Sequence, residues 1–418
     1  MHIRLFQFLI ALSAVTAGAA PLTLDEAIRI FRTSGFDLLI ANANVESARA
    51  DEQIAAALPN PSFSLSRGST SNYDPTLCAG CSSHSISAGV TDSAISDLVS
   101  GRRRLRTDVA RALVGVSAAT RDDVERTLEF SVKQQLLQAE LAKKSLDFAR
   151  QAHELAAETF DLISKRYHAG AVSEADVARA DVQRLESEQA MDSATQALDV
   201  AKSQLAFLLG VPEPIEVADD LVQPSSVATS RDEVYRDAIE HRPDLTAARL
   251  QIERARSGIE LAKRQRVPDF SPSLQYSREG SGQSAIQPPT LTFGVTTALP
   301  ILYRYRGEVA RAEADLRAQE IAKLKIEAQV SADVSASFAG FQSARARVER
   351  MQSRLLPQAA RARDLVRLQY EKGAASLFEF LDAQRTYLAA QNEYLQTLND
   401  DWTAVFQMEQ ASGVELNR

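Results

Sequence analysis

The most extensive pattern in this chain is that of two very long helices, predicted over about 104–168 and 307–371. No glycine or proline occurs between Gly115 and Gly170, and apolar residues recur there at steps of three and four. The residues of this row are Leu128, Val132, Ala139, Ala142, Leu146, Ala149, Ala156, Phe160, Ile163 and Tyr167. Such spacing is typical of a coiled-coil seam. In the second helix the same spacing is interrupted at Pro357, where we expect a kink.

Four shorter helices are predicted over about 24–57, 173–209, 231–265 and 376–412. The first and third begin after Thr23 and Ser230, and each of these residues is followed three positions later by a glutamate, which is the signature of a capping box. Gly35 and Pro243 predict a break in the same two helices. Two of the shorter helices placed end to end are about as long as one long helix. Such a pair could therefore run antiparallel beside a long helix.

Each long helix is predicted to turn back sharply into the helix that follows it. Gly170 and Gly373 stand at the ends of the long helices, where glycine readily adopts the positive φ of a helix C-cap. Ser173 and Ser376 follow three residues later, and each has an acidic residue three positions further on. Because this is an N-cap signal, we expect two tight helical hairpins with their tips at these glycines.

Two segments, 62–100 and 270–305, have the alternating pattern of β-hairpins, with polar loops at about 68–84 and 278–288. Apolar side chains alternate there with Ser, Thr and Gln, so that each strand has one apolar and one small polar face. A face this polar suits the interior of a water-filled β-barrel better than a packed sandwich. The alternative is a solvated β-domain packed on helices.

The order of helix, hairpin, long helix and returning helix occurs twice, which indicates an internal duplication. The segment Arg166–Ser173 aligns with Gln369–Ser376, and the intervals from Gly170 to Gly210 and from Gly373 to Gly413 are both 40 residues. The predicted division of the chain is a signal peptide 1–20, a first repeat 21–210, a linker 211–230, a second repeat 231–413 and a C-terminal tail 414–418.

The first twenty residues have the pattern of a secretory signal. His2 and Arg4 precede an apolar run from Leu5 to Val15, and small residues follow it. A membrane anchor is the alternative. After residue 20 no apolar stretch approaches the roughly 18 to 20 residues that a spanning helix needs. If the mature chain lies in a membrane, a β-barrel is therefore the expected form.

Composition narrows the choice of function. With 45% hydrophobic and 24% charged residues, the 418-residue chain can bury a core and is not disordered. Its 47 basic and 55 acidic side chains give a net charge of −8, which argues against a nucleic-acid partner. Four strands cannot close a wide barrel, whereas three chains supply twelve. The predicted fold is therefore mainly α with a β-barrel part: a homotrimer with a 12-stranded barrel, continued by a helical tube.

The two cysteines, Cys78 and Cys81, lie with His84 in a loop of the first hairpin. A local disulfide between them is the plain interpretation for an exported loop, and a soft-metal site including His84 or a redox pair is the alternative. Two cysteines exclude a disulfide-dense scaffold. No nucleophile triad, phosphate-binding loop or His-x-x-x-His pair occurs elsewhere, so we expect neither an enzyme nor a cofactor.

Several segments together carry a family resemblance. They are the capped sequence Leu22–Ala27, Leu58–Phe63, Leu299–Glu308 and the Tyr-x-x-Gly-x-x-Ser pattern of both tips. This ordered set resembles the TolC family of outer-membrane efflux proteins over nearly the whole chain after residue 20. The resemblance implies an outer-membrane β-barrel in contact with lipid and a periplasmic α-helical barrel. It also implies a periplasmic adaptor protein and an inner-membrane pump of the RND type as partners. The stretch 304–312 looks most like the branch that exports metal cations.

The resemblance also implies roles for residues near the tips. Members of the family narrow their pore with acidic side chains, which points to Glu379 and Asp382 and, in the first repeat, to Asp176, although Arg179 stands there opposite Asp382. In a trimer each carboxylate would form a ring that attracts cations; the alternative is a solvated acid near a helix N-terminus. The expected contacts with the adaptor are Arg166, Gly170, Val172, Ser173, Lys372, Gly373 and Ser376, with turn chemistry as the alternative.

Two functions from different classes follow from these observations. The first is a passive trimeric duct in the outer membrane, which exports small molecules or metal cations with energy supplied by its partners. The second is a soluble periplasmic coiled-coil protein with a structural or adaptor-like role. The alternating strands with polar inner faces favour the duct.

Overall fold

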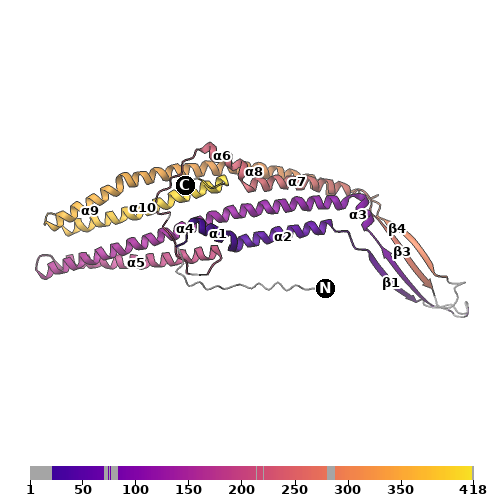
Figure 1. Ribbon diagram of the computed structural model, residues 1–418, viewed down its shortest axis with the longest axis horizontal. Helices are drawn as coiled ribbons and strands as arrows, with labels where there is room; N and C mark the ends of the chain where they lie inside the picture. Colours follow the sequence, from indigo (N-terminus) through magenta and orange to yellow (C-terminus); the bar gives the residue numbers. More distant parts are fainter. Residues whose placement is uncertain are drawn as a thin grey trace. The chain divides into compact units, whose positions relative to one another are not determined.

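The computed structural model describes residues 21–69, 74, 76, 83–212, 214–219, 221–279 and 288–416. The predicted signal peptide 1–20 and the pair Cys78 and Cys81 lie outside these residues. The chain divides into two compact units, and each draws on both sequence repeats (Figure 1). We call residues 1–39, 125–241 and 332–418 the helical unit, and residues 40–124 and 242–331 the sheet unit.

The helices agree with the predicted order. They are α1 (Leu24–Ser34), α2 (Phe36–Ala56), α3 (Ala94–Ser100), α4 (Arg102–His168), α5 (Glu174–Leu209), α6 (Arg231–His241), α7 (Pro243–Arg264), α8 (Arg306–Arg350), α9 (Leu356–Glu371) and α10 (Leu377–Ser412). The predicted breaks are confirmed, because α1 ends one residue before Gly35 and α7 begins at Pro243. The capping role of Thr23 is confirmed too, since its hydroxyl accepts the N–H of Glu26.

The kink expected at Pro357 takes the form of a π-helical turn over Met351–Leu355, directly before α9. Proline has no N–H to donate to the carbonyl four residues earlier, so the regular ladder of hydrogen bonds is interrupted at Ser353. A wider turn accommodates the interruption while Met351 stays buried. The second long helix is therefore α8 and α9 joined by this turn.

The sheet unit contains one antiparallel sheet in the order β1 (Ser62–Ser69), β2 (His84–Thr91), β3 (Phe270–Glu279) and β4 (Thr290–Thr297). Its register aligns apolar residues in a row across all four strands, Phe63, Val90, Leu274 and Phe293. The next row consists of Ser64, Gly89, Gln275 and Thr292. Because side chains alternate between faces, one face of the sheet is apolar and the other is small and polar, as predicted.

The two segments predicted as hairpins, 62–100 and 270–305, are too long at their C-terminal ends. The strands end at Thr91 and Thr297, and residues 94–100 form the short helix α3. The Asp92 carboxylate accepts the N–H of Ala94 at 2.7 Å, which supports a turn into the helix. Local hydrogen bonding by an aspartate side chain therefore outweighs the apolar alternation of this stretch.

The core of the helical unit lies between α1, α4, α5 and α10. Leu136, Leu137, Leu205, Phe406 and Met408 are all buried there. Part of the predicted seam of α4 is buried too, namely Val132, Ala139, Leu146, Ala156 and Ile163. A core of this kind orders a helix through packing of one face rather than through helix propensity.

The segment 211–230, predicted as a linker, is held by buried carboxylates of the helical unit. Glu140 accepts the N–H of Leu221 at 2.8 Å, and Asp401 accepts the N–H of Ser225 at 2.9 Å. Both acids are almost completely buried. The segment is thus part of the packed structure, because these hydrogen bonds satisfy backbone groups that burial removes from water.

Within the described residues, no helix combines the length and apolar character needed to cross a membrane.

Candidate functional site

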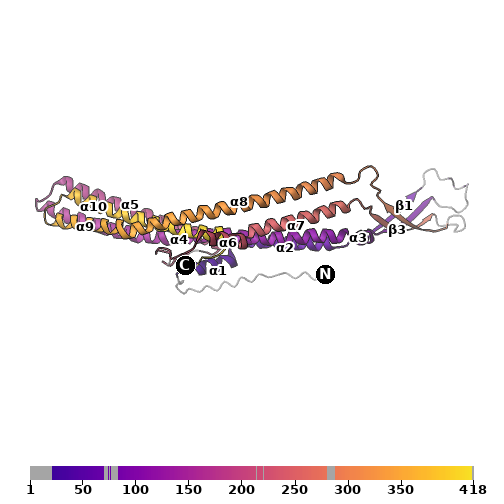
Figure 2. The same ribbon diagram turned by 90° about the horizontal axis from the view of Figure 1, so that it is seen from above.

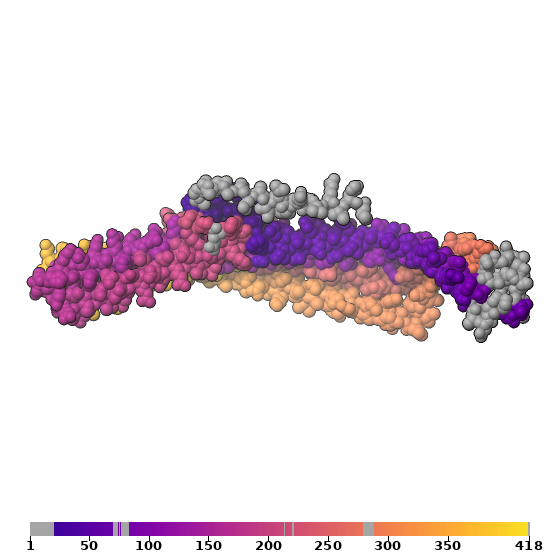
Figure 3. Space-filling model, turned by 90° about the horizontal axis from the view of Figure 1, so that it is seen from below, coloured from indigo at the N-terminus to yellow at the C-terminus, as the bar shows by residue number. Residues whose placement is uncertain are grey.

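The two helical hairpins, α4 with α5 and α9 with α10, end at the same side of the helical unit (Figures 1 and 2). In the space-filling view the α4–α5 hairpin, in magenta, covers the visible face of this end (Figure 3). All candidate site residues suggested by the family resemblance lie at or near these two tips. The structure therefore brings the two sets of residues, about 200 positions apart in sequence, into one region.

Each tip is a Schellman turn. Gly170 has φ of 74° and Gly373 has φ of 77°, which confirms the predicted left-handed C-caps. The N–H of Ala171 donates to the carbonyl of Arg166 at 2.9 Å, and Gly170 donates to Tyr167 at 2.8 Å. The second tip repeats both hydrogen bonds. This pattern satisfies carbonyls that would otherwise be left without partners at the helix end.

Both returning helices begin with a complete capping box. The N–H and hydroxyl of Ser376 donate to the Glu379 carboxylate at 2.7 and 3.0 Å, and the Glu379 N–H donates back to the hydroxyl. Ser173 and Asp176 form the same arrangement in the first tip. Two of the three predicted aperture carboxylates, Glu379 and Asp176, are therefore bound to the backbone of their own turn.

These hydrogen bonds favour the ionised form of both acids. The Ser376 N–H, followed by its hydroxyl, lowers the pKa of Glu379 from its ordinary value of 4.5. The Ser173 hydroxyl, followed by its N–H, lowers the pKa of Asp176 from 3.8. Hydrogen bonds to a carboxylate favour its charged state. The capping carboxylate of each tip is therefore ionised at neutral pH.

A small core fastens the two tips to each other. The rings of Tyr370 and Phe380 stack with centroids 5.2 Å apart and planes within 3°. The guanidinium of Arg166 lies over the other hairpin's Tyr370 ring, 4.9 Å from its centroid. Ile163 and Ala180 are buried in the same cluster. A cation above an aromatic face is attracted by the ring's quadrupole, so Arg166 links the hairpins.

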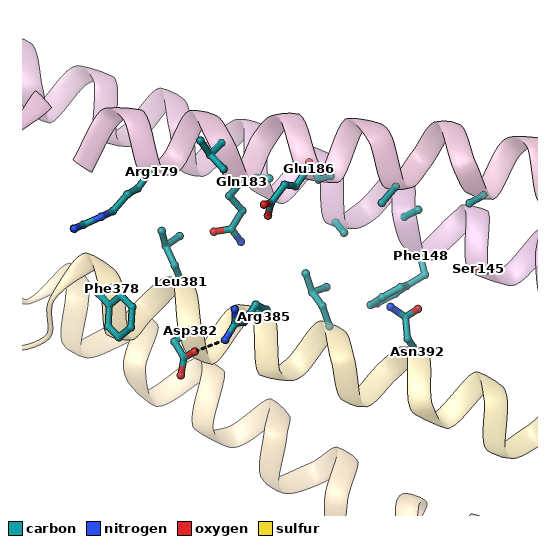
Figure 4. Close-up of a pocket in the computed structure, with 18 residues that line it drawn as sticks. Ser145, Phe148, Arg179, Gln183, Glu186, Phe378, Leu381, Asp382, Arg385 and Asn392 are labelled. Carbon is teal, nitrogen blue, oxygen red and sulfur yellow. Dashed lines mark hydrogen bonds and ion pairs between the residues drawn. The ribbon is translucent and has the colours of Figure 1, made fainter. Parts of the chain in front are cut away.

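A groove of about 540 Å³ lies between the α4–α5 hairpin and α10 (Figure 4). Phe148, Phe378 and Leu381 form part of its apolar wall. Asp382 lines the groove and pairs with Arg385 at 3.2 Å, as the dashed line in Figure 4 shows. Glu379 does not line this groove. Of the predicted aperture residues, Asp382 is thus the one that lines this groove.

The groove has charges of both signs rather than acids alone. Arg179 lines it opposite α10 and pairs with Asp176 at 3.5 Å, while Arg385 is bound to Asp382. Arg385 was missed in the sequence, although its position three residues after Asp382 is a spacing at which helical ion pairs form. Local pairing therefore offsets part of the negative charge that the sequence predicts for this region.

The residues predicted to contact an adaptor differ in exposure. Gly170, Ser173, Lys372, Gly373 and Ser376 are exposed. Arg166 and Val172 are partly buried against the tip core. The exposed members form a surface at the tips, while the other two hold that surface together. Contact with an adaptor stays a prediction.

The cysteine loop is only partly described. His84 is the first residue of β2 and lies opposite Ser69 in the register, whereas Cys78 and Cys81 lie outside the described residues. Within the described part of the chain, no group of three or more His, Cys, Asp and Glu side chains could hold a metal ion. The disulfide and the metal site both stay predictions.

Comparison with known proteins identifies relatives along almost the whole chain. A family model described as "Outer membrane efflux protein" matches residues 29–211 and again residues 234–414. The cobalt-zinc-cadmium resistance protein CzcC of Cupriavidus metallidurans is 24% identical, over 94% of this chain and 91% of the relative. The pyoverdine export outer membrane protein OpmQ of Pseudomonas putida is 26% identical, over 88% and 81%.

A solved structure has the same fold. A crystal structure of CusC, described in terms of folding and transmembrane channel formation, superposes with a TM-score of 0.76. It covers 96% of each chain at 18% identity. The combination of a small sheet and long helical hairpins is therefore shared with a channel of known structure.

The capping box at Ser376 predicts a pH-dependent tip. Because the folded pKa of Glu379 is lowered, its stabilising effect is present above pH 4.5 and is lost as the pH falls through the folded pKa. Amide hydrogen exchange in the first turn of α10 should therefore be slower in the wild type than in Glu379→Gln above about pH 5, and the difference should vanish in acid. Asp382→Asn, outside the cap, is the matched control. Equal protection of wild type and Glu379→Gln at every pH would contradict this role.

Proposed function

Because the chain belongs to the outer membrane efflux protein family, we propose that three copies of it form the outer-membrane duct of a tripartite efflux system. Members of this family work in such systems and form trimers. The duct is passive in this proposal: a pump in the inner membrane supplies the energy, and a periplasmic adaptor joins pump and duct. The resemblance of the sequence favours a pump of the RND type.

The observation that carries the proposal is the division of the sheet into two faces. Large apolar side chains on one face are solvent-exposed in the single chain: Phe63, Leu65, Ile86, Val90, Leu274, Tyr276, Leu291, Phe293 and Val295. The other face has small hydroxyls that bond to each other, as between Ser66 and Ser87 at 2.7 Å. A wall with lipid outside and water inside requires this arrangement. A soluble coiled-coil protein, the alternative from the sequence, would expose the apolar face to water.

The open edges of the sheet support three copies. Among the described strands, β1 pairs only with β2 and β4 only with β3. Backbone groups in a bilayer must find partners within the protein, so neither edge can stay open. Three chains supply twelve strands, enough for a barrel that encloses water.

Metal cations are the cargo that we propose. CzcC, a cobalt-zinc-cadmium resistance protein by name, matches this chain over most of both lengths. The sequence of segment 304–312 also looks most like that of the family branch that exports metal cations. The similarity to OpmQ, a pyoverdine export protein by name, favours a second candidate cargo, namely small organic molecules.

The tips are the proposed place for both the adaptor and the aperture. Exposed residues at the glycine turns, including Gly170, Lys372 and Gly373, offer a surface whose backbone is fixed by Schellman turns. Asp382 lines the groove next to them. In a trimer three copies of Asp382 would attract cations, and Arg385 would moderate that attraction.

Deletion of the gene in its host, followed by growth on cobalt, zinc and cadmium salts, tests the cargo. Resistance should fall and return with the wild-type gene. Ala374→Trp, which places a bulky side chain on the exposed second tip, should not restore it although the folded trimer reaches the outer membrane. Ala197→Trp, on exposed α5 and roughly 35 Å from the tip along the helix, should restore it fully. Unchanged metal resistance with lost export of an organic compound would favour the second cargo, and unchanged export of both classes would contradict the duct.

The charge pair of the groove predicts opposite effects on ion selectivity. In planar bilayers Asp382→Asn should lower the ratio of cation to anion permeability, because a ring of carboxylates is lost. Arg385→Gln should raise it, because the same carboxylates lose their partner. A change of about fivefold is expected, since two charges ~4 Å apart in water interact by about 1 kcal/mol. Identical selectivity in both variants and the wild type would exclude Asp382 from the conducting path.

A further inference from the structure

At one end of its strands, the sheet unit has exposed apolar side chains that do not belong to the strand pattern. They belong to two segments of the sheet unit, helix α3 and the loop 299–303 that follows β4. Leu302 is 102% exposed, and Val99 on α3 is 68% exposed. Ile95, Leu98, Leu299 and Ile301 are exposed as well. Exposed apolar patches of this kind mark surfaces that bind another phase or another molecule.

Both segments lie at the same end of the strands. The register pairs Ser62 with Thr91 and Phe270 with Thr297, so β2 and β4 end where β1 and β3 begin. Helix α3 follows β2 and the loop follows β4. Figure 1 shows α3 at this end of the strands. The exposed apolar residues of α3 and of the loop therefore lie at the same end of the sheet.

Helix α3 buries its polar side and exposes its apolar side, which is the opposite of a helix on the surface of a water-soluble protein. Its polar residues Ser96, Asp97 and Ser100 are buried, while its apolar residues are exposed. The buried groups have partners: the Ser96 hydroxyl accepts the N–H of Phe270 at 3.1 Å, and Asp97 pairs with Arg106 at 3.2 Å. A helix in water buries its apolar stripe. The fixed reversal in α3 indicates that its outer face has apolar surroundings.

The loop after β4 is held in shape by its own hydrogen bonds. The Tyr303 hydroxyl donates to the Glu308 carboxylate at 2.6 Å and accepts the N–H of Gly307 at 3.1 Å. A Cβ at Gly307 would lie 2.5 Å from that hydroxyl oxygen, so the contact requires glycine. Ile301 donates to the carbonyl of Leu299 at 2.8 Å. The loop thus exposes Leu302 in an ordered turn.

Charge follows the apolar surface on its helical side. The acids there are engaged: Asp97 with Arg106, Asp269 with Arg102, and Glu308 with Tyr303. Next to this surface, Arg266, Arg304 and Arg306 are exposed and have no ion-pair partner among the residues that the structure describes. Arg304 and Arg306 directly follow the loop, and Arg266 lies four residues before β3, which begins at the same end of the sheet. Unpaired cations beside an apolar patch complement anionic headgroups.

We propose that α3 and the loop 299–303 insert into the leaflet of the outer membrane nearest the helices, where Arg266, Arg304 and Arg306 bind phospholipid phosphates. The apolar side chains then lie at the level of the upper acyl chains, and the guanidinium groups lie at the headgroups. The surface anchors the sheet at a fixed depth. This role rests on family membership and is independent of cargo and adaptor.

Depth-dependent fluorescence quenching tests the insertion. Leu302→Trp in the full-length trimer, reconstituted with phospholipids brominated near the headgroup end of the acyl chain, should be quenched strongly and protected from aqueous iodide. Leu365→Trp, at an exposed position on α9, should show the reverse, and the emission of native Trp402 is subtracted with wild-type protein. Quenching of Leu302→Trp by iodide would overturn the proposal. Insensitivity to both quenchers would overturn it too, by placing Leu302 in a contact between subunits.

A lipid-charge experiment tests the arginines separately. In nanodiscs of phosphatidylcholine, replacing a quarter of the lipid with phosphatidylglycerol should raise the temperature at which the wild-type trimer dissociates. Arg304→Glu with Arg306→Glu should abolish this gain, while Arg361→Glu on α9 should keep it. Inorganic phosphate should have no effect. An equal rise in dissociation temperature in the wild type and the double variant would overturn the phosphate contact. A negative result in the metal-resistance experiment would not change the expected outcome of either membrane test.

Discussion

Strands β1 and β4 each have an edge whose backbone N–H and C=O groups find no partner strand within the described part of a single chain. The sheet between them has a row of large apolar side chains on one face and small hydroxyls on the other. In water, open edges can bond to solvent, but exposure of the apolar face is unfavourable. In lipid, the apolar face is favourable, but unpaired N–H and C=O groups at the edges cost free energy. Only closure with further copies in a membrane satisfies both requirements. The proposed closed barrel and its place in a membrane follow from this one constraint, whereas the proposed number of three chains rests on the strand count.

The helical unit has a different requirement, which is to hold two tips in register. Tyr370 stacks on Phe380 and lies beneath Arg166 of the other hairpin, so the tips form one small core. Capping boxes and Schellman turns fix each tip locally. Buried Glu140 and Asp401 bind the segment between the repeats to the same unit. The surface that we propose for the adaptor is therefore built on helix ends with fixed hydrogen bonds.

Much of the fold could be predicted because it depends on periodicity and on a few special residues. Steps of three and four gave the long helices, alternation gave the strands, and Gly170 and Gly373 gave the turns. Features that depend on tertiary contacts could not be predicted in this way. The π-helical turn before Pro357, the helix α3 and the buried hydrogen bonds of Asp401 are examples. At the tips, the sequence identified the acids and the serines that cap with Asp176 and Glu379, whereas the pairing of Asp382 with Arg385 appeared only in the structure.

Disulfide trapping between the open edges tests the central claim most directly. In one chain β1 and β4 are separated by three strand spacings, about 14 Å, which is too far for a disulfide with Cα atoms at most about 7 Å apart. In a background with Cys78→Ser and Cys81→Ser, cysteines at Ser64 or Ser66 are combined with cysteines at Thr290 or Thr292. Oxidation in the membrane should yield covalent species that end at the trimer for at least one pair in register. Monomers alone for every pair, or a ladder that continues past three copies, would contradict a closed barrel of three chains.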